Sequence, residues 1–180
     1  GVLFHTDAVQ AVGHIPINVK ELGVDLLSAS AHKFNGMKGS GFLYILKGTE
    51  ICPYADGGSQ ERGKRAGTEN IAAIAAMAVA LKKNCDRMKE STRKLNDLEK
   101  ILLGRLTDSG IDYIRNGSAN HLPGNVNISV RGADGEMLLH RLDLKGICIS
   151  TGSACDSVNT RVSHVIEAIR VPEIYAKGTV

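Results

Sequence analysis

Tryptophan is absent from this sequence of 180 residues, and aromatic residues make up only 4% of it. Because nucleic-acid-binding proteins stack bases on aromatic rings and carry strong positive charge, 4% aromatics with a net charge of +3 disfavours nucleic-acid binding. No stretch approaches 18 consecutive apolar residues, which argues against a membrane span. What is present, 43% hydrophobic and 23% charged residues, predicts a globular fold.

Cysteine is also scarce, and its spacing excludes several functions. The four cysteines are Cys52, Cys85, Cys148 and Cys155. None forms a C-x-x-C pair, and together with the six histidines they make no metal-ligand pattern, so no metal site is predicted. Free thiols and the absence of a secretory signal pattern predict a reducing, cytoplasmic location.

Methionine is missing from the first position. The chain starts at Gly1 inside an apolar run and stops at Val180. We therefore expect the sequence to be a piece of a longer protein.

The first half of the chain alternates strand-like and helix-like patterns. Apolar, strand-like stretches separated by short helical or polar segments occur at 1–5, 15–19, 24–30 and 41–46. Continuous apolar runs of this kind predict an α/β fold with a buried, mainly parallel sheet. A long helical pattern, as two helices or one kinked helix, continues from the polar loop 56–70 to about residue 106.

The pattern changes after residue 112. Short strands are predicted at 113–116, 125–130 and 146–150, with helices at 134–144 and 161–170. This is a small α+β unit. We predict two domains, the C-terminal part of a large domain with the bridging helix at 1–90 and a small domain at 91–180.

Two polar residues follow predicted strands of the first half. Asp7 ends the first strand, and Lys33 follows the strand at 24–30. If the two strands are parallel neighbours, both side chains emerge at the carboxyl edge of the sheet, where α/β proteins bind ligands. A desolvated lysine can act as an amine nucleophile, and Ser30 and His32 offer donors to a phosphate. A solvated surface lysine is the alternative.

Cys155 lies in the run STGSACDS, among small and hydroxyl-bearing residues. No apolar neighbour surrounds it, so an accessible, nucleophilic thiol is favoured over a buried cysteine. The buried interpretation suits Cys148 better, because Cys148 alternates with isoleucines in a predicted strand. Cys52 and Cys85 are also interpreted as structural.

Four stretches carry a specific resemblance. In order, FHTDAVQAVGHIPINV, DLLSASAHKFNGMKGSGFLYI, GGSQERGKRAGTEN and STGSACDS resemble the NifS/IscS-type cysteine desulfurases. These are pyridoxal-phosphate enzymes of fold type I in the class V aminotransferase group. The resemblance implies part of their large cofactor-binding domain followed by their small C-terminal domain.

The resemblance also implies roles for individual residues. Lys33 resembles the lysine that holds the cofactor, Asp7 the partner of its pyridine nitrogen, and Gln10 the donor to its phenolic oxygen. Ser30 and His32 resemble phosphate ligands, and Thr68 resembles the phosphate ligand supplied across the interface of a homodimer. Cys155 resembles the nucleophile that takes sulfur from L-cysteine, leaving alanine and an enzyme persulfide for an acceptor or scaffold protein in iron–sulfur cluster or thio-cofactor assembly.

The sequence also departs from this family. The stretch after Cys155 lacks the proline that the family usually has, and the stacking residue and the substrate-carboxylate arginine of the family are absent. The isolated chain is therefore expected to be inactive. The alternatives are another class V enzyme, such as a selenocysteine lyase or an aminotransferase, and a non-catalytic folding or interaction domain. A thiol at position 155 argues against a plain aminotransferase, which needs no nucleophilic sulfur.

Overall fold

The computed structural model describes residues 1–152 and 162–180. These residues form two compact units, Gly1–Arg93 and Lys94–Val180. Cys155 lies outside the described residues.

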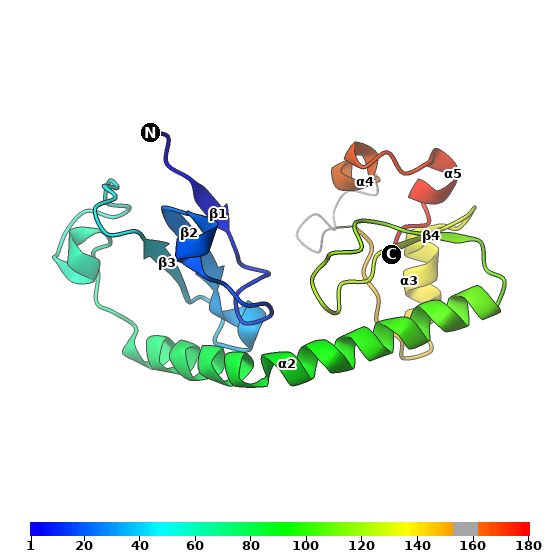
Figure 1. Cartoon of the computed structure of the whole chain (residues 1–180), viewed down its shortest axis with the longest axis horizontal. Helices are drawn as coiled ribbons and strands as arrows, with labels where there is room; N and C mark the ends of the chain where they lie inside the picture. Colours follow the sequence, from blue (N-terminus) through cyan, green and yellow to red (C-terminus); the bar gives the residue numbers. More distant parts are fainter. Residues whose placement is uncertain (153–161) are drawn as a thin grey trace. The chain divides into compact units, whose positions relative to one another are not determined.

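The first unit is built around a three-stranded sheet in the order β1-β2-β3 (Figure 1). Its strands are β1 (His5–Asp7), β2 (Leu26–Ser30) and β3 (Gly41–Ile45). β1 and β2 are parallel, as the sequence predicts, whereas β3 is antiparallel to β2. The mixture of helices and sheet agrees with the predicted α/β class.

Short helical segments connect these strands. Helix α1 (Val19–Leu22) precedes β2, and the 3-10 turn η1 (Ala31–Phe34) follows it directly. A second 3-10 turn, η2 (Gln60–Gly63), lies in the polar loop before the long helix. The strand predicted at 15–19 is wrong, because residues 15–18 have no regular structure and α1 begins at Val19.

The core of the first unit forms on one face of β2. Leu27 and Ala29 alternate with half-buried residues along the strand and are themselves buried. Phe34 is fully buried beside them, and Met77, Ala80 and Leu81 of the long helix pack against the cluster. Burial of Phe34 anchors η1, since its aromatic side chain removes a large apolar area from water.

The long helix α2 (Ile71–Asp108) is one continuous element (Figure 1). It begins at a cap in which the Oδ1 of Asn70 accepts a hydrogen bond from the amide of Ala73 at 3.1 Å. Of the two predicted arrangements, two helices or one kinked helix, the structure has a single helix over this range. Its N-terminal part is rich in alanine, the best helix former.

Besides the C-terminal part of α2, the described residues of the second unit form a small sheet and three short helices. Strands β4 (Tyr113–Arg115) and β5 (Ile128–Val130) are antiparallel. The residues 178–180 extend this sheet, because the amide of Ile128 donates to the carbonyl of Val180 at 3.0 Å and the reverse bond is 2.9 Å. The helices are α3 (Gly135–Asp143), α4 (His164–Ala168) and α5 (Glu173–Ala176).

Several boundaries differ from the sequence-based prediction. The first strand begins at His5, and the last predicted helix is reduced to α4 within the described residues. The strand predicted at 146–150 is wrong: these residues form an irregular segment, and Cys148 is exposed instead of buried. The other two described cysteines, Cys52 and Cys85, are exposed as well. Among the residues that the structure describes, no helix is both long enough and apolar enough to span a membrane.

Candidate active site

Asp7 stands at the carboxyl end of β1. The parallel register pairs it with Ser28 of β2, two residues before that strand ends. Its Oδ1 accepts a hydrogen bond from the amide of Val9 at 2.9 Å, which orients the carboxylate at the start of the following turn. Asp7 is exposed, so a ligand can reach its carboxylate.

Ser30 and His32 form a pair at the carboxyl end of β2. The Ser30 Oγ lies 2.8 Å from the His32 Nδ1, within hydrogen-bond distance. Ser30 is half-buried and His32 is exposed. The pair therefore brings a hydroxyl and an imidazole together on the same edge of the sheet as Asp7.

Lys33 lies in η1, immediately after β2, and its side chain is exposed. Its backbone is held from another segment, because the Nε2 of His14 lies 2.8 Å from the carbonyl oxygen of Lys33. A carbonyl oxygen can only accept, so the His14 ring donates here. The amine of Lys33 is thus carried on a short turn whose main chain is fixed.

The other two described candidates lie in loops. Gln10 is exposed in the turn that follows β1, and Thr68 is exposed just before α2. The loop of Thr68 is stabilised by a hydrogen bond of 3.1 Å from the amide of Gly67 to the Oε1 of Gln60. The assignment of Gln10 and Thr68 as cofactor ligands remains a prediction, as does that of Cys155.

Asn84, which belongs to none of the sequence motifs, contacts the turn that carries Lys33. Its Nδ2 donates to the carbonyl oxygen of Phe34 at 2.7 Å. His14 contacts the same turn. The available signal was an asparagine inside an alanine-rich helix, where it is a poor helix former.

The donor chemistry of this edge fits pyridoxal phosphate. Asp7 could supply a carboxylate for a protonated pyridine nitrogen, and Ser30 with His32 could supply donors for a phosphate. Lys33 could supply an amine for the aldehyde carbon. Within residues 1–152 and 162–180, no group of three or more histidine, cysteine or carboxylate side chains is placed to hold a metal ion.

Comparison with known proteins gives the family. The sequence pattern of the class V aminotransferases matches residues 1–179. The chain belongs to the class V aminotransferase family. Enzymes of this family depend on pyridoxal phosphate, in agreement with the donor chemistry of the sheet edge.

The similar proteins are cysteine desulfurases. The chain is 50% identical to the cysteine desulfurase IscS of Dictyoglomus turgidum, over 99% of this chain and 46% of that protein. It is 44% identical to the IscS of Methanosarcina thermophila, over 99% of this chain and 44% of that protein. A NifS-like protein from Rickettsia africae superimposes with a TM-score of 0.84 at 32% identity, over 98% of this chain and 46% of the other.

This chain therefore spans about half the length of the relatives it matches. The family and the fold, including the NifS-like arrangement predicted from the four sequence stretches, are confirmed by these comparisons.

Proposed function

We propose that the protein containing this chain is a cysteine desulfurase. It removes sulfur from L-cysteine and leaves alanine and a persulfide on Cys155. The observation that carries the proposal is the shared sheet edge: Asp7 ends β1, the Ser30–His32 pair ends β2, and Lys33 follows in η1. The similarity to cysteine desulfurases favours this reaction over the other reactions of the class V aminotransferase family.

The residues of the edge would bind and orient the cofactor. Asp7, already oriented by the Val9 amide, would keep the pyridine nitrogen protonated. Ser30, His32 and the exposed Thr68 would hold the phosphate, Thr68 from the neighbouring subunit of a homodimer, and Gln10 would donate to the phenolic oxygen. Bound pyridoxal phosphate supplies an electron sink for the substrate's α-carbon.

Lys33 and Cys155 would carry out the chemistry. Lys33 would hold the cofactor through its amine and move a proton at the α-carbon of the substrate. The Cys155 thiolate would attack the sulfur of the substrate, so that the carbon–sulfur bond breaks and a sulfur–sulfur bond forms. The electron pair of the carbon–sulfur bond would remain with the substrate carbon, which takes up the proton lost by the thiol and becomes the methyl group of alanine. The reduction of this carbon balances the oxidation of the two sulfurs to a persulfide.

The persulfide would then be passed to an acceptor or scaffold protein that assembles iron–sulfur clusters or thio-cofactors. A persulfide is a reactive derivative of a thiol. A reducing environment, in which cysteines stay free, is therefore the setting we expect for it. We therefore propose a cytoplasmic location for this protein.

Two substitutions in the full-length protein test the proposal. Lys33→Ala should abolish the visible absorbance band of bound pyridoxal phosphate. Lys38→Ala, at an exposed lysine in the loop that follows η1, should preserve the band. Cys155→Ser should keep the band but prevent persulfide formation from L-cysteine, measured by mass spectrometry, whereas Cys148→Ser should leave it unchanged.

Each outcome separates a different alternative. If the band survives Lys33→Ala, Lys33 is not the residue that holds the cofactor. If the persulfide forms on another thiol, Cys155 is not the sulfur acceptor. A band without any persulfide in the parent protein would favour another class V enzyme over the desulfurase.

A further inference from the structure

Three contacts hold the turn around Lys33, two of them on its main chain. The His14 ring donates to the carbonyl oxygen of Lys33 at 2.8 Å. The next carbonyl, that of Phe34, accepts from the Nδ2 of Asn84 at 2.7 Å. The following residue, Asn35, donates from its own Nδ2 to the Oδ1 of Asn84 at 3.0 Å. Two of these three contacts come from one side chain of α2.

Asn84 makes three hydrogen bonds at this place. Its two amide protons are directed to the carbonyl oxygens of Phe34 and of Ala80, the latter at 2.8 Å, and its oxygen accepts from Asn35. Asn84 is half-buried, so loss of these partners would leave polar groups with restricted access to water. The side chain is therefore a fixed bridge between α2 and the turn.

Close packing reinforces the bridge. Phe34, which lies between Lys33 and Asn35 in the chain, is fully buried. A Cβ placed on Gly13 would lie 2.9 Å from the Cβ of Phe34 and 3.4 Å from that of Asn84. Only glycine tolerates this approach at a φ of +81°, so the segment before His14, the turn and α2 meet closely.

We infer that Asn84 is a positioning residue for Lys33. The Lys33 side chain is long and exposed, and the direction in which it leaves the sheet edge is set by the main chain of η1. Reacting groups must be held within about 0.5 Å of their productive geometry, and a fixed main chain limits the positions that the amine can reach. This inference rests on the proposed role of Lys33 as the residue that holds the cofactor.

The substitution Asn84→Asp in the full-length protein tests the inference. It keeps the shape of the side chain but replaces the donor by a carboxylate oxygen that faces two carbonyl oxygens. In cofactor-free protein, we expect hydrogen exchange of the amides at 31–36 to rise about tenfold, as for the loss of one to two hydrogen bonds. In the loaded protein, cofactor dissociation should become about tenfold faster, and the pH midpoint of the visible band should shift.

Two control variants separate positioning from a general loss of stability. Asn96→Asp makes the same change at an exposed position of α2 and should alter none of these measurements. Met77→Ala removes apolar packing from α2 against the core. It should lower the urea midpoint of unfolding but leave the pH midpoint of the band at the parent value.

Unchanged exchange at 31–36 in Asn84→Asp would overturn the inference. So would an equal shift of the pH midpoint in Met77→Ala, because stability alone would then explain it. Failure of the proposed function has a different signature: the parent protein would show no band, while exchange at 31–36 still responded to Asn84→Asp. In that case Asn84 would only stabilise the turn, and the inference that it positions Lys33 for the cofactor would be wrong.

Discussion

At the scale of single residues, Tyr175 shows how one hydroxyl secures a short helix. Its phenol donates to the Oδ1 of Asp112 at 2.9 Å, and Arg131 pairs with the other oxygen of that carboxylate at 3.2 Å. The hydrogen bond to Asp112 is the main reason that the pKa of Tyr175 is raised above its ordinary value of 10.0, since only the neutral phenol can donate. The contact connects the four residues of α5 to the start of the small sheet.

The raised pKa of Tyr175 gives a pH-dependent prediction. The stabilising contact should be fully present below pH 10.0, the ordinary pKa, and lost as the pH rises through the raised pKa of the folded state. Tyr175→Phe should therefore lower the urea midpoint at neutral pH, and its difference from the parent should vanish in strong alkali. Tyr54→Phe, at a tyrosine that is 92% exposed, is the control and should have no effect. A difference that does not depend on pH would contradict the role of the phenol.

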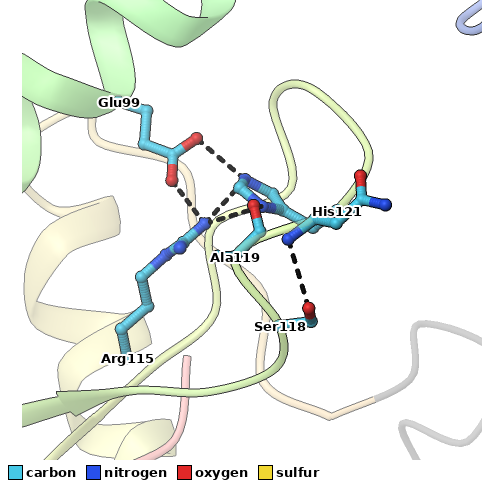
Figure 2. A network of polar contacts seen from close by, with 6 residues as sticks. Glu99, Arg115, Ser118, Ala119 and His121 are labelled. Atoms are coloured by element: carbon cyan, nitrogen blue, oxygen red, sulfur yellow. Dashed lines mark hydrogen bonds and ion pairs between the residues drawn. The ribbon is translucent and has the colours of Figure 1, made fainter.

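At the scale of elements, Glu99 attaches the loop between β4 and β5 to α2 (Figure 2). Its two carboxylate oxygens bind different partners, the guanidinium of Arg115 and, at 3.0 Å, the Nε2 of His121. The Glu99 side chain is only 10% exposed. The His121 ring is further held through its Nδ1, which lies 3.0 Å from the carbonyl oxygen of Ala119.

Glu99→Ala should therefore reduce the free energy of unfolding of the second unit by about 2 kcal/mol, because it leaves Arg115 without its anionic partner. Asp86→Ala on the same helix removes a Lys82 pair whose side chains are 76% and 59% exposed, and should cost less than about 0.5 kcal/mol. Urea unfolding followed by hydrogen exchange measures both variants, Glu99→Ala in residues 94–180 and Asp86→Ala in residues 71–93 of α2. Equal effects would show that the low exposure of Glu99 does not strengthen its contacts.

The same elements show what the sequence could predict. Local signals were sufficient for α3, whose cap Asp134 accepts from the amide of Met137 at 3.0 Å, and for the length of α2. The alternation at 146–150 was misleading, because an apolar alternation predicts a strand only where a neighbouring strand pairs with it. Helix α5 was not predicted, since four residues carry too little periodicity to be recognised.

For the candidate site, the sequence placed Asp7 and Lys33 at one edge only on the condition that their strands are parallel neighbours, and the pairing of β1 with β2 meets that condition. The bridge from Asn84 to Phe34 could not be predicted in the same way. It joins residues 50 positions apart in the chain, and its existence depends on how α2 packs on the core.

At the scale of the whole molecule, the edge that carries Lys33 is open in this chain. Asp7, His32 and Lys33 are all exposed. A cofactor site normally buries about 70–90% of its ligand, so under the proposed function the described residues would form only one wall of the site. The proposal then requires the remaining walls to come from other parts of the full-length protein and from the proposed partner subunit.

The isolated chain should consequently bind pyridoxal phosphate at least about tenfold more weakly than the full-length protein, since it lacks the contacts of those walls. Equilibrium dialysis with absorbance detection measures both affinities, and circular dichroism confirms that the isolated chain is folded. Other surface amines also react with the aldehyde, so the Lys33→Ala form of each protein is the control. The signal specific to Lys33 should be large in the full-length protein and close to zero in the isolated chain. Equal affinities would instead mean that the edge between β1 and η1 is a complete site, and that neither a partner subunit nor Thr68 from that subunit is needed to hold the phosphate.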